Sequence, residues 1–209
     1  MLPTGHLLAF TIAATVLIAI PGPSVLFTVS RALTIGRRGA LLTVLGNAAG
    51  LYVQVLAVAL GVGAVVARSA EVFTAVKVVG AAYLIWLGVQ ALRHRRTPDL
   101  RQPVTAGARQ VLREGFVVGV TNPKMIVFLA VALPGFVDPA AGHVPLQMLV
   151  LGLVVLAIAL VSDGVWAVSA GTASEWFARS PDRIARVRGA GGLSLIGLGA
   201  GLAVAGRPH

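Results

Sequence analysis

The chain has 209 residues, of which 57% are hydrophobic and only 11% are charged, and its formal net charge is +10. Because soluble domains average about 25% charged residues, this composition excludes an ordinary water-soluble domain and favours a polytopic membrane protein. The chain contains no Cys, and its four His residues have no paired ligand spacing. Disulfides, thiolate metal sites and thiol redox chemistry are therefore excluded, and no metal site is predicted.

Six apolar stretches are long enough to cross a bilayer as helices, at 1.5 Å per residue. They lie at about residues 7–30, 39–67, 72–92, 115–137, 146–170 and 189–206. The first is retained as a span, because it lacks the basic start and small-residue cleavage site of a signal peptide. The sequence predicts one all-α transmembrane domain, 1–209, with three spans at about 5–92, a cytoplasmic loop at about 93–113, and three spans at about 114–206.

The basic residues cluster between the predicted spans. Of the 17 Lys and Arg residues, 13 fall in the stretches after spans one, three and five. They are Arg31, Arg37, Arg38, Arg93, Arg95, Arg96, Arg101, Arg109, Arg113, Arg179, Arg183, Arg186 and Arg188. The positive-inside rule therefore predicts cytoplasmic odd loops and both termini outside, so the charge reflects topology and nucleic-acid binding is not expected.

The first span is interrupted by Ile20-Pro21-Gly22-Pro23. A proline inside a helix removes a backbone donor and clashes with the preceding turn, at a cost of about 3 kcal/mol or more. Pro21 disfavours the α conformation at Ile20, Gly22 tolerates a turn, and Pro23 suits the first position of a new helix. The motif predicts a broken helix.

The fourth span carries a matching interruption at Thr121-Asn122-Pro123-Lys124, where Asn122 is a good N-cap and Pro123 again suits a helix start. Both breaks lie roughly 12–15 Å from the predicted cytoplasmic face, near the middle of the bilayer core. Three spans per half make the two halves oppositely oriented. This pattern indicates two inverted three-helix repeats whose first helices, spans one and four, are discontinuous.

Each new helix start presents backbone N–H groups, expected at Ser24 and Val25 in one break and at Lys124 and Met125 in the other. Together with the helix dipoles, these donors favour an anion such as a substrate carboxylate. The predicted substrate-binding residues are Pro21, Gly22, Pro23, Ser24, Asn47, Asn122, Pro123 and Lys124.

Lys124 and Asp163 are ionisable residues well inside predicted spans, where charge costs about 3 kcal/mol on insertion scales. Asp163 can bind a substrate ammonium, carry a proton or pair with Lys124, and all three roles stay open. Lys77 lies near a span end and is expected to snorkel, whereas Trp86 and Trp166 suit interfacial anchors.

Further polar residues inside spans are weaker candidates for lining a path: Asn47, Tyr52, Gln54 and Ser162. Glycines at small-xxx-small spacing allow helices to approach closely. They form the pairs Gly46/Gly50, Gly115/Gly119 and Gly197/Gly201. Intramolecular packing is the favoured interpretation, and a homo-oligomer is left open.

With these motifs in place, the chain resembles the lysine-exporter (LysE/RhtB-type) family of bacterial amino-acid exporters. The resemblance is carried by IPGPSVLFTVSRALTIGRRGALLTVLGNAAG at 20–50, VKVVGAAYLIWLGVQAL at 76–92 and EGFVVGVTNPKMIVFLAVALPGFV at 114–137. The PGP and NPK motifs match by position, as do Gly36, Gly39, Gly46 and Gly50; Asp163 corresponds only loosely.

The resemblance implies a secondary active exporter of small amino acids or their derivatives, a multi-pass protein of the bacterial inner membrane. It implies proton-gradient drive and no cofactor, with the amino acid, protons and lipid as the partners. The substrate carboxylate is expected at the half-helix starts.

Two alternatives remain beside amino-acid export. Export of another small solute or a cation is one, although a cation would favour clustered His, carboxylate or Cys ligands. An intramembrane enzyme or redox carrier is the other. The absence of Cys opposes redox chemistry, and the adjacent residues Ser162 and Asp163 cannot face each other on a helix. No enzymatic activity is expected.

Overall fold

The computed structural model describes residues 4–62, 70–94, 107–173 and 180–204, and every regular element among them is a helix. The elements are α1 (Thr4–Ala19), α2 (Pro23–Ala57), the π-helical η1 (Val58–Val62), α4 (Ala70–Arg93), α5 (Ala108–Val120), α6 (Pro123–Phe136), the 3₁₀ turn η2 (Pro139–Ala141), α7 (Val144–Thr172) and α9 (Pro181–Val204). The predicted all-α class is confirmed for this part of the chain.

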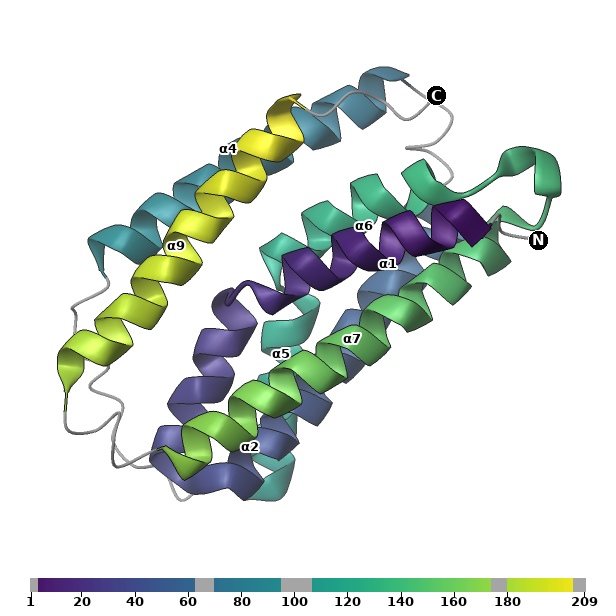
Figure 1. The fold of residues 1–209 in the computed structure, drawn as a ribbon. Helices are drawn as coiled ribbons and strands as arrows, with labels where there is room; N and C mark the ends of the chain where they lie inside the picture. The colour runs from purple at the N-terminus through teal and green to yellow at the C-terminus, as the bar shows by residue number, and fades with distance from the viewer. Residues whose placement is uncertain (1–3, 63–69, 95–106, 174–179, 205–209) are drawn as a thin grey trace.

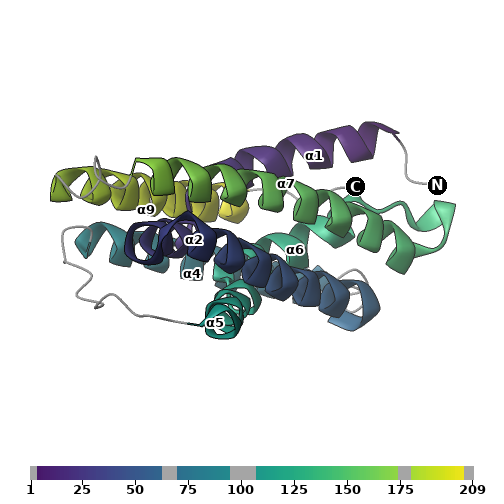
Figure 2. The same cartoon turned by 90° about the horizontal axis from the view of Figure 1, so that it is seen from below.

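The helices form a main bundle and an adjoining pair. In Figure 1, α1, α2, α5, α6 and α7 gather together, while α4 and α9 run side by side along the bundle. Figure 2 looks almost along the axis of α5, which therefore crosses the longer helices steeply. Within the bundle, α2 packs most extensively, against both α5 and α7.

The sequence predicts a loop between spans one and two, and this prediction is wrong. α2 continues through this stretch with a single non-helical residue, Gly36 (φ 78°, ψ 179°), where the chain changes direction (Figure 1). Glycine adopts this positive φ without a Cβ penalty, so one residue suffices for the turn. Arg31, predicted in the loop, consequently lies inside α2 and is buried.

Two other helices begin earlier than their predicted spans. α5 begins at Ala108 and α9 at Pro181, so Arg109, Arg113 and Arg183 are helical. Hydropathy detects only the apolar part of a helix, whereas Arg has good helix propensity and extends the helix beyond it. Part of the predicted 93–113 loop, residues 95–106, lies outside the described residues.

Glycine pairs bring α2 and α5 into backbone contact. A Cβ on Gly46 would lie 2.2 Å from the carbonyl oxygen of Leu112, and one on Gly119 would lie 2.3 Å from that of Asn47. Gly50 and Gly115 are equally close to the opposing backbone. The predicted intramolecular role is confirmed for these two pairs, whereas nothing described lies within 4 Å of Gly197 or Gly201.

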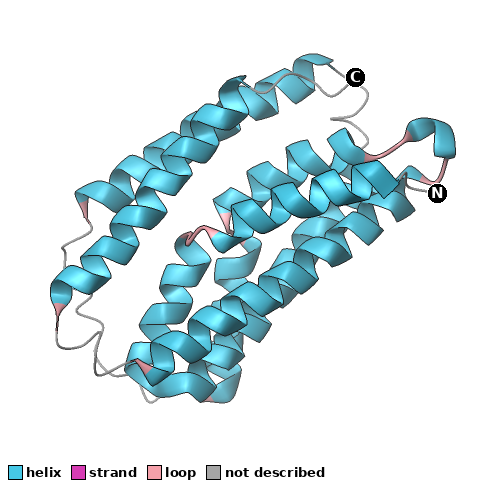
Figure 3. Ribbon diagram, in the orientation of Figure 1, coloured by secondary structure: helices cyan, strands magenta, loops and turns pink. Residues whose placement is uncertain are grey.

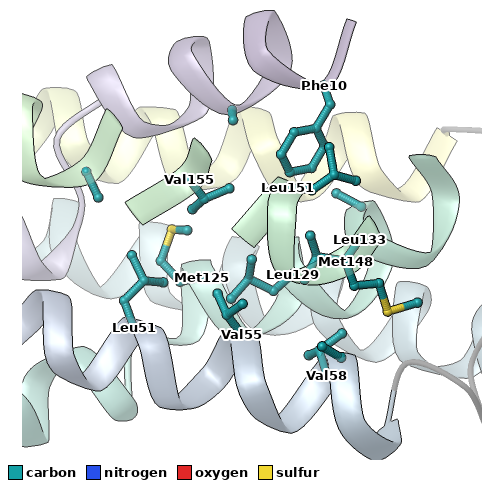
Figure 4. Packing of buried hydrophobic residues seen from close by; sticks show 14 of the residues in the cluster. Phe10, Leu51, Val55, Val58, Met125, Leu129, Leu133, Met148, Leu151 and Val155 are labelled. Carbon is teal, nitrogen blue, oxygen red and sulfur yellow. The ribbon is translucent and has the colours of Figure 1, made fainter. Parts of the chain in front are cut away.

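The largest apolar cluster joins five elements of the bundle, α1, α2, η1, α6 and α7 (Figure 4). Phe10 of α1 is fully buried and its ring stacks on Phe128 at 5.9 Å between centroids. The cluster extends through residues of α2, α6 and α7, among them Val55, Leu129 and Leu151. This packing fixes α1 and α6 against the long helices, on one side of the two breaks.

The outer surface remains strongly apolar. α1 exposes Leu8, Ile12 and Val16, each between 59% and 64%, as a stripe along its outer face. Contiguous apolar surface on this scale suits lipid contact. Two described helices, Pro23–Gly61 and Val144–Thr172, are long and apolar enough to cross a membrane, and α5 with α6 makes a third span if this pair, bent by 49°, is counted as one.

The shorter apolar helices coincide with the remaining predicted spans: Thr4–Ala19, Val78–Gln90 and Gly189–Gly201. The six-span topology with its outward-facing termini therefore stays a prediction.

The glycine contacts give a stability prediction. Gly46→Ala places a methyl group against the α5 backbone, which cannot yield locally, so the helices must separate at a cost of about 1–3 kcal/mol. Gly197→Ala is the matched control, because the new methyl group meets open space and alanine favours a helix. Thermal unfolding in detergent should show a lower melting temperature for the first variant only; equal melting temperatures would contradict the contact.

Candidate functional site

The two helix breaks meet inside the bundle. α1 ends at Ala19 and α2 begins at Pro23, while α5 ends at Val120 and α6 begins at Pro123. Figure 3 shows the breaks as short loop segments beside each other. The Asn122 amide nitrogen donates to the Ser24 hydroxyl oxygen at 3.2 Å, so the breaks are in direct contact. Both predicted interruptions are confirmed.

At the first break, Gly22 precedes the helix and Pro23 occupies its first turn, as predicted. Gly22 is extended (φ −112°, ψ −169°), a conformation open to any residue, so its predicted role in tolerating a turn is wrong. The constraint is space, because a Cβ on Gly22 would lie 3.1 Å from Cδ of Lys124.

At the second break, Asn122 caps α6 as predicted, and its Oδ1 accepts from the Lys124 backbone N–H at 3.2 Å. The expectation that this N–H is open for a ligand is therefore wrong. A good N-cap satisfies the same donors that an anion would need.

The last carbonyl groups before each break also have partners. Lys124 Nζ donates to the carbonyl oxygen of Ile20 at 2.7 Å. The Gln54 amide donates to the carbonyl oxygens of Gly119 and Val120 at 2.8 and 3.0 Å. In each case a side chain from another helix supplies the donor that the interrupted helix lacks. Gln54 thus donates to carbonyl oxygens at the second break, as Lys124 donates to a carbonyl oxygen at the first.

The start of α2 is treated differently, because no side chain caps it. The N–H groups of Ser24 and Val25 lie in its first turn, where a helix has no acceptor of its own. Of the four helix ends at the breaks, the start of α2 is therefore the one for which the described residues provide no side-chain partner.

A cavity of about 20 Å³ lies where the breaks meet. It is lined by Ile18, Ser24, Val25, Asn47, Leu51, Gly119, Asn122, Lys124, Met125, Ala159 and Asp163. This volume holds about one water molecule. A larger solute can enter only if the surrounding helices move apart.

Asp163 brings a carboxylate to this cavity from α7. It is 4% exposed, and the Asn47 amide nitrogen donates to its Oδ2 at 2.8 Å. Asn47 thus presents its nitrogen to Asp163, and its buried Oδ1 has no hydrogen-bond partner among the residues that the structure describes. Lys124 lines the same cavity, but the direct ion pair left open above is not formed.

The structure thus brings Ser24, Asn47, Asn122, Lys124 and Asp163 to one cavity. Pro21, Gly22, Pro23 and Pro123 lie in or beside the breaks and shape the backbone there.

The other polar candidates lie elsewhere. Tyr52 is exposed, and Ser162 is half-buried without lining the cavity. Trp86 is exposed, whereas Trp166 packs on the cluster around Val25 and Val29. The side chain of Lys77 lies outside the described residues.

Sequence reasoning missed two features near the breaks. A Cβ on Gly191 of α9 would lie 2.5 Å from the Pro21 carbonyl oxygen, so α9 closes against the first break. Gly191 is hidden in a glycine-rich stretch, 189–192, that gives no signal of its own. The second feature is an ion pair between Arg31 and Glu114, two residues predicted at the edges of spans.

The helical fold has an apolar outer surface and a polar cavity where two broken helices meet. This combination is typical of membrane transport proteins. The chain belongs to the LysE type translocator family, whose sequence pattern it matches over residues 15–206. Members of this family are transporters, which supports an efflux transporter and opposes an enzyme.

Individual relatives extend over nearly the whole chain. A protein of Vibrio cholerae serotype O1, named an uncharacterized membrane protein, is 37% identical over 206 residues, covering 95% of this chain and 96% of its own. A homoserine/homoserine lactone efflux protein of Salmonella typhimurium is 32% identical over 198 residues, covering 94% and 95%. No solved structure matches the chain significantly.

The capping of the second break gives a further prediction. Gln54→Met keeps the length of the side chain but leaves the Gly119 and Val120 carbonyl groups without their donor, which should cost about 1–3 kcal/mol. Gln90→Met is the control, because the Gln90 side chain has no hydrogen bond among the described residues. Thermal unfolding in detergent distinguishes the two variants, and an unchanged melting temperature for Gln54→Met would refute the capping role.

Proposed function

We propose that the chain is a secondary active exporter of small amino acids or their derivatives, driven by the proton gradient. One observation carries the proposal: the uncapped start of α2 and the Asp163 carboxylate line the same buried cavity. A zwitterionic amino acid carries one negative and one positive group, and the cavity offers a partner for each.

The cargo carboxylate binds at the start of α2, where the N–H groups of Ser24 and Val25 have no side-chain cap. The positive end of the helix dipole favours an anion there. Lys124 adds a buried positive charge to the cavity. The start of α6 contributes less than the sequence suggests, because Asn122 already occupies its Lys124 N–H.

The cargo ammonium binds at Asp163 and Asn47. Asp163 supplies a carboxylate, and the unpartnered Oδ1 of Asn47 supplies a second acceptor at the same cavity. A buried acceptor without a partner is costly, so a donor from the cargo would relieve a cost that the empty site carries.

Asp163 also carries the coupling proton in this proposal. Protonation removes its charge and weakens its hold on an ammonium group, so proton and cargo compete for one carboxylate. The proton gradient then drives cargo outward by exchange. This competition requires only one titrating carboxylate at the cavity, which matches its lining.

The proposed transport cycle rocks two inverted three-helix halves around the cavity in the inner membrane. The pairing of corresponding helices supports such halves, since α4 packs on α9 and α2 on α7. The water-sized cavity supports an occluded state between the two open ones. A cation as cargo fits less well, because Lys124 shares the cavity with a single carboxylate.

Export is tested in a bacterial host that is sensitive to amino acids and their analogues. Homoserine and homoserine lactone are the first compounds to test, because a relative is named for their efflux. The lactone has no free carboxylate, so the proposed site should favour homoserine. Resistance to none of a broad panel, with membrane insertion verified, would refute the proposal.

Asp163→Asn tests the coupling role. The amide keeps the size of the side chain but cannot take up a proton, so efflux from proteoliposomes should no longer accelerate with an imposed pH gradient. Asp138→Asn is the matched control, because Asp138 lies outside the cavity and its carboxylate accepts from the Ala140 N–H at the start of η2, a bond that an Asn side-chain oxygen can also accept. Full pH-driven transport in Asp163→Asn would contradict the role.

A further inference from the structure

A partly buried ion pair, with the Glu114 side chain 32% exposed, joins the two helices that run from the cavity to the same end of the bundle. The Arg31 guanidinium of α2 pairs with the Glu114 carboxylate of α5. Arg31 is only 9% exposed, and its guanidinium carbon lies 4.9 Å from the centre of the Phe27 ring. Gln110 donates to the other Glu114 oxygen at 3.0 Å. Both partners are thus held in place by further contacts.

A polar face of α2 connects this ion pair to the cavity. Ser24, Thr28 and Arg31 are spaced four and three residues apart, which places them on one helix face. Ser24 lines the cavity, and Arg31 follows roughly 10 Å further along the helix. Thr28, between them, is fully buried, and its hydroxyl has no hydrogen-bond partner within the described part of the chain.

An unpartnered hydroxyl in a dry core is costly, and Val or Ala would fill the same place without that cost. The Thr28 hydroxyl would gain a hydrogen-bond partner if water or cargo reached this face of α2 in another state of the protein. The neighbouring face, with Val25, Val29 and Ala32, packs into an apolar cluster instead and offers no such route.

We infer that the face formed by Ser24, Thr28 and Arg31 is the route by which cargo reaches the cavity, and that the Arg31–Glu114 pair is the gate that closes it. The inference rests on the proposed function, because it makes the cavity the destination of the cargo. α2 and α5 must separate along this face before a cavity of about 20 Å³ can admit an amino acid.

The position of the pair fits this role. The glycine contacts hold α2 to α5 through the part of α2 that follows Gly36, whereas Arg31 belongs to the part before it. The glycine contacts therefore do not hold the segment 23–35 to α5, and separation of this segment from α5 leaves them intact. The end of the bundle at Ala108 and Gly36 is the predicted cytoplasmic one, so the gate faces the side from which an exporter loads.

The gate is tested by thiol labelling. The chain contains no Cys, so Thr28→Cys introduces a single thiol on the route without breaking a hydrogen bond. A membrane-impermeant methanethiosulfonate reagent is applied to inside-out and right-side-out vesicles that contain the full chain. Adding Arg31→Ala or Glu114→Gln should accelerate labelling about tenfold, from the cytoplasmic side alone, because the first removes the closing interaction and the second removes the charge that strengthens it.

Two further variants separate a gate from a general structural contact. Arg31→Glu combined with Glu114→Arg restores an ion pair of reversed direction and should return labelling to the slow parental rate. Arg113→Ala removes a neighbouring exposed charge on α5 and should leave the rate unchanged.

Unchanged labelling in both single variants would overturn the gate, as would equal acceleration from both sides of the membrane. If the Arg31→Ala variant does not insert into the membrane, the labelling rate of Glu114→Gln decides whether the pair is a gate, because this substitution preserves the size of the side chain. Labelling requires no cargo, so the labelling result does not depend on the transport assays that test the proposed function. The two can therefore fail separately.

Discussion

The fold depends on one constraint: a helix that breaks in an apolar interior leaves backbone groups that need partners. In lipid or in a dry core, each unsatisfied group costs several kcal/mol. This chain breaks two helices beside each other and supplies missing partners by side chains: Gln54 and Lys124 reach across from other helices, and Asn122 caps the helix that it precedes. Lys124, Gln54 and Asn122 are buried for this reason, and each joins elements that would otherwise be independent.

The same constraint accounts for which polar groups line the cavity and which of them have partners. Three of the four helix ends at the breaks are satisfied from within the protein, whereas no side chain caps the start of α2. The same cavity holds an acceptor without a partner, Asn47 Oδ1, beside the Asp163 carboxylate. Unused donors and unused acceptors at one cavity are the complement of a zwitterion. The backbone contacts between α2 and α5 keep this arrangement compact.

The sequence predicted the parts of this site that rest on local chemistry. Proline at a helix start and asparagine as an N-cap act within a few residues, so both breaks and the capping of α6 were predictable. Small-xxx-small spacing likewise predicted close intramolecular helix packing at Gly46 and Gly50, although it did not indicate that α5 is the partner. Lys124 and Asp163 were recognised because charge inside a span is rare.

What the sequence could not predict depends on tertiary contacts. Nothing local indicates that Gln54 reaches the carbonyl groups of α5, or that Arg31 meets Glu114. Arg31 resembles a loop charge until the turn at Gly36 is seen to need a single residue. The role of Gly22 was misjudged for the same reason, because the Lys124 side chain that limits its space comes from the other half of the chain.

The central claim is that the open N–H groups at the start of α2 bind the cargo carboxylate. Gly22 occupies the N-cap position of α2, so a serine there would place a hydroxyl within reach of the Ser24 or Val25 N–H. Gly22→Ala adds the same Cβ, with the same contact to Lys124, but no acceptor. The decisive measurement is cargo affinity in proteoliposomes for Gly22→Ser against Gly22→Ala. The account predicts markedly weaker affinity in Gly22→Ser, because its hydroxyl occupies a donor that the carboxylate needs; equal affinity in the two variants would contradict it.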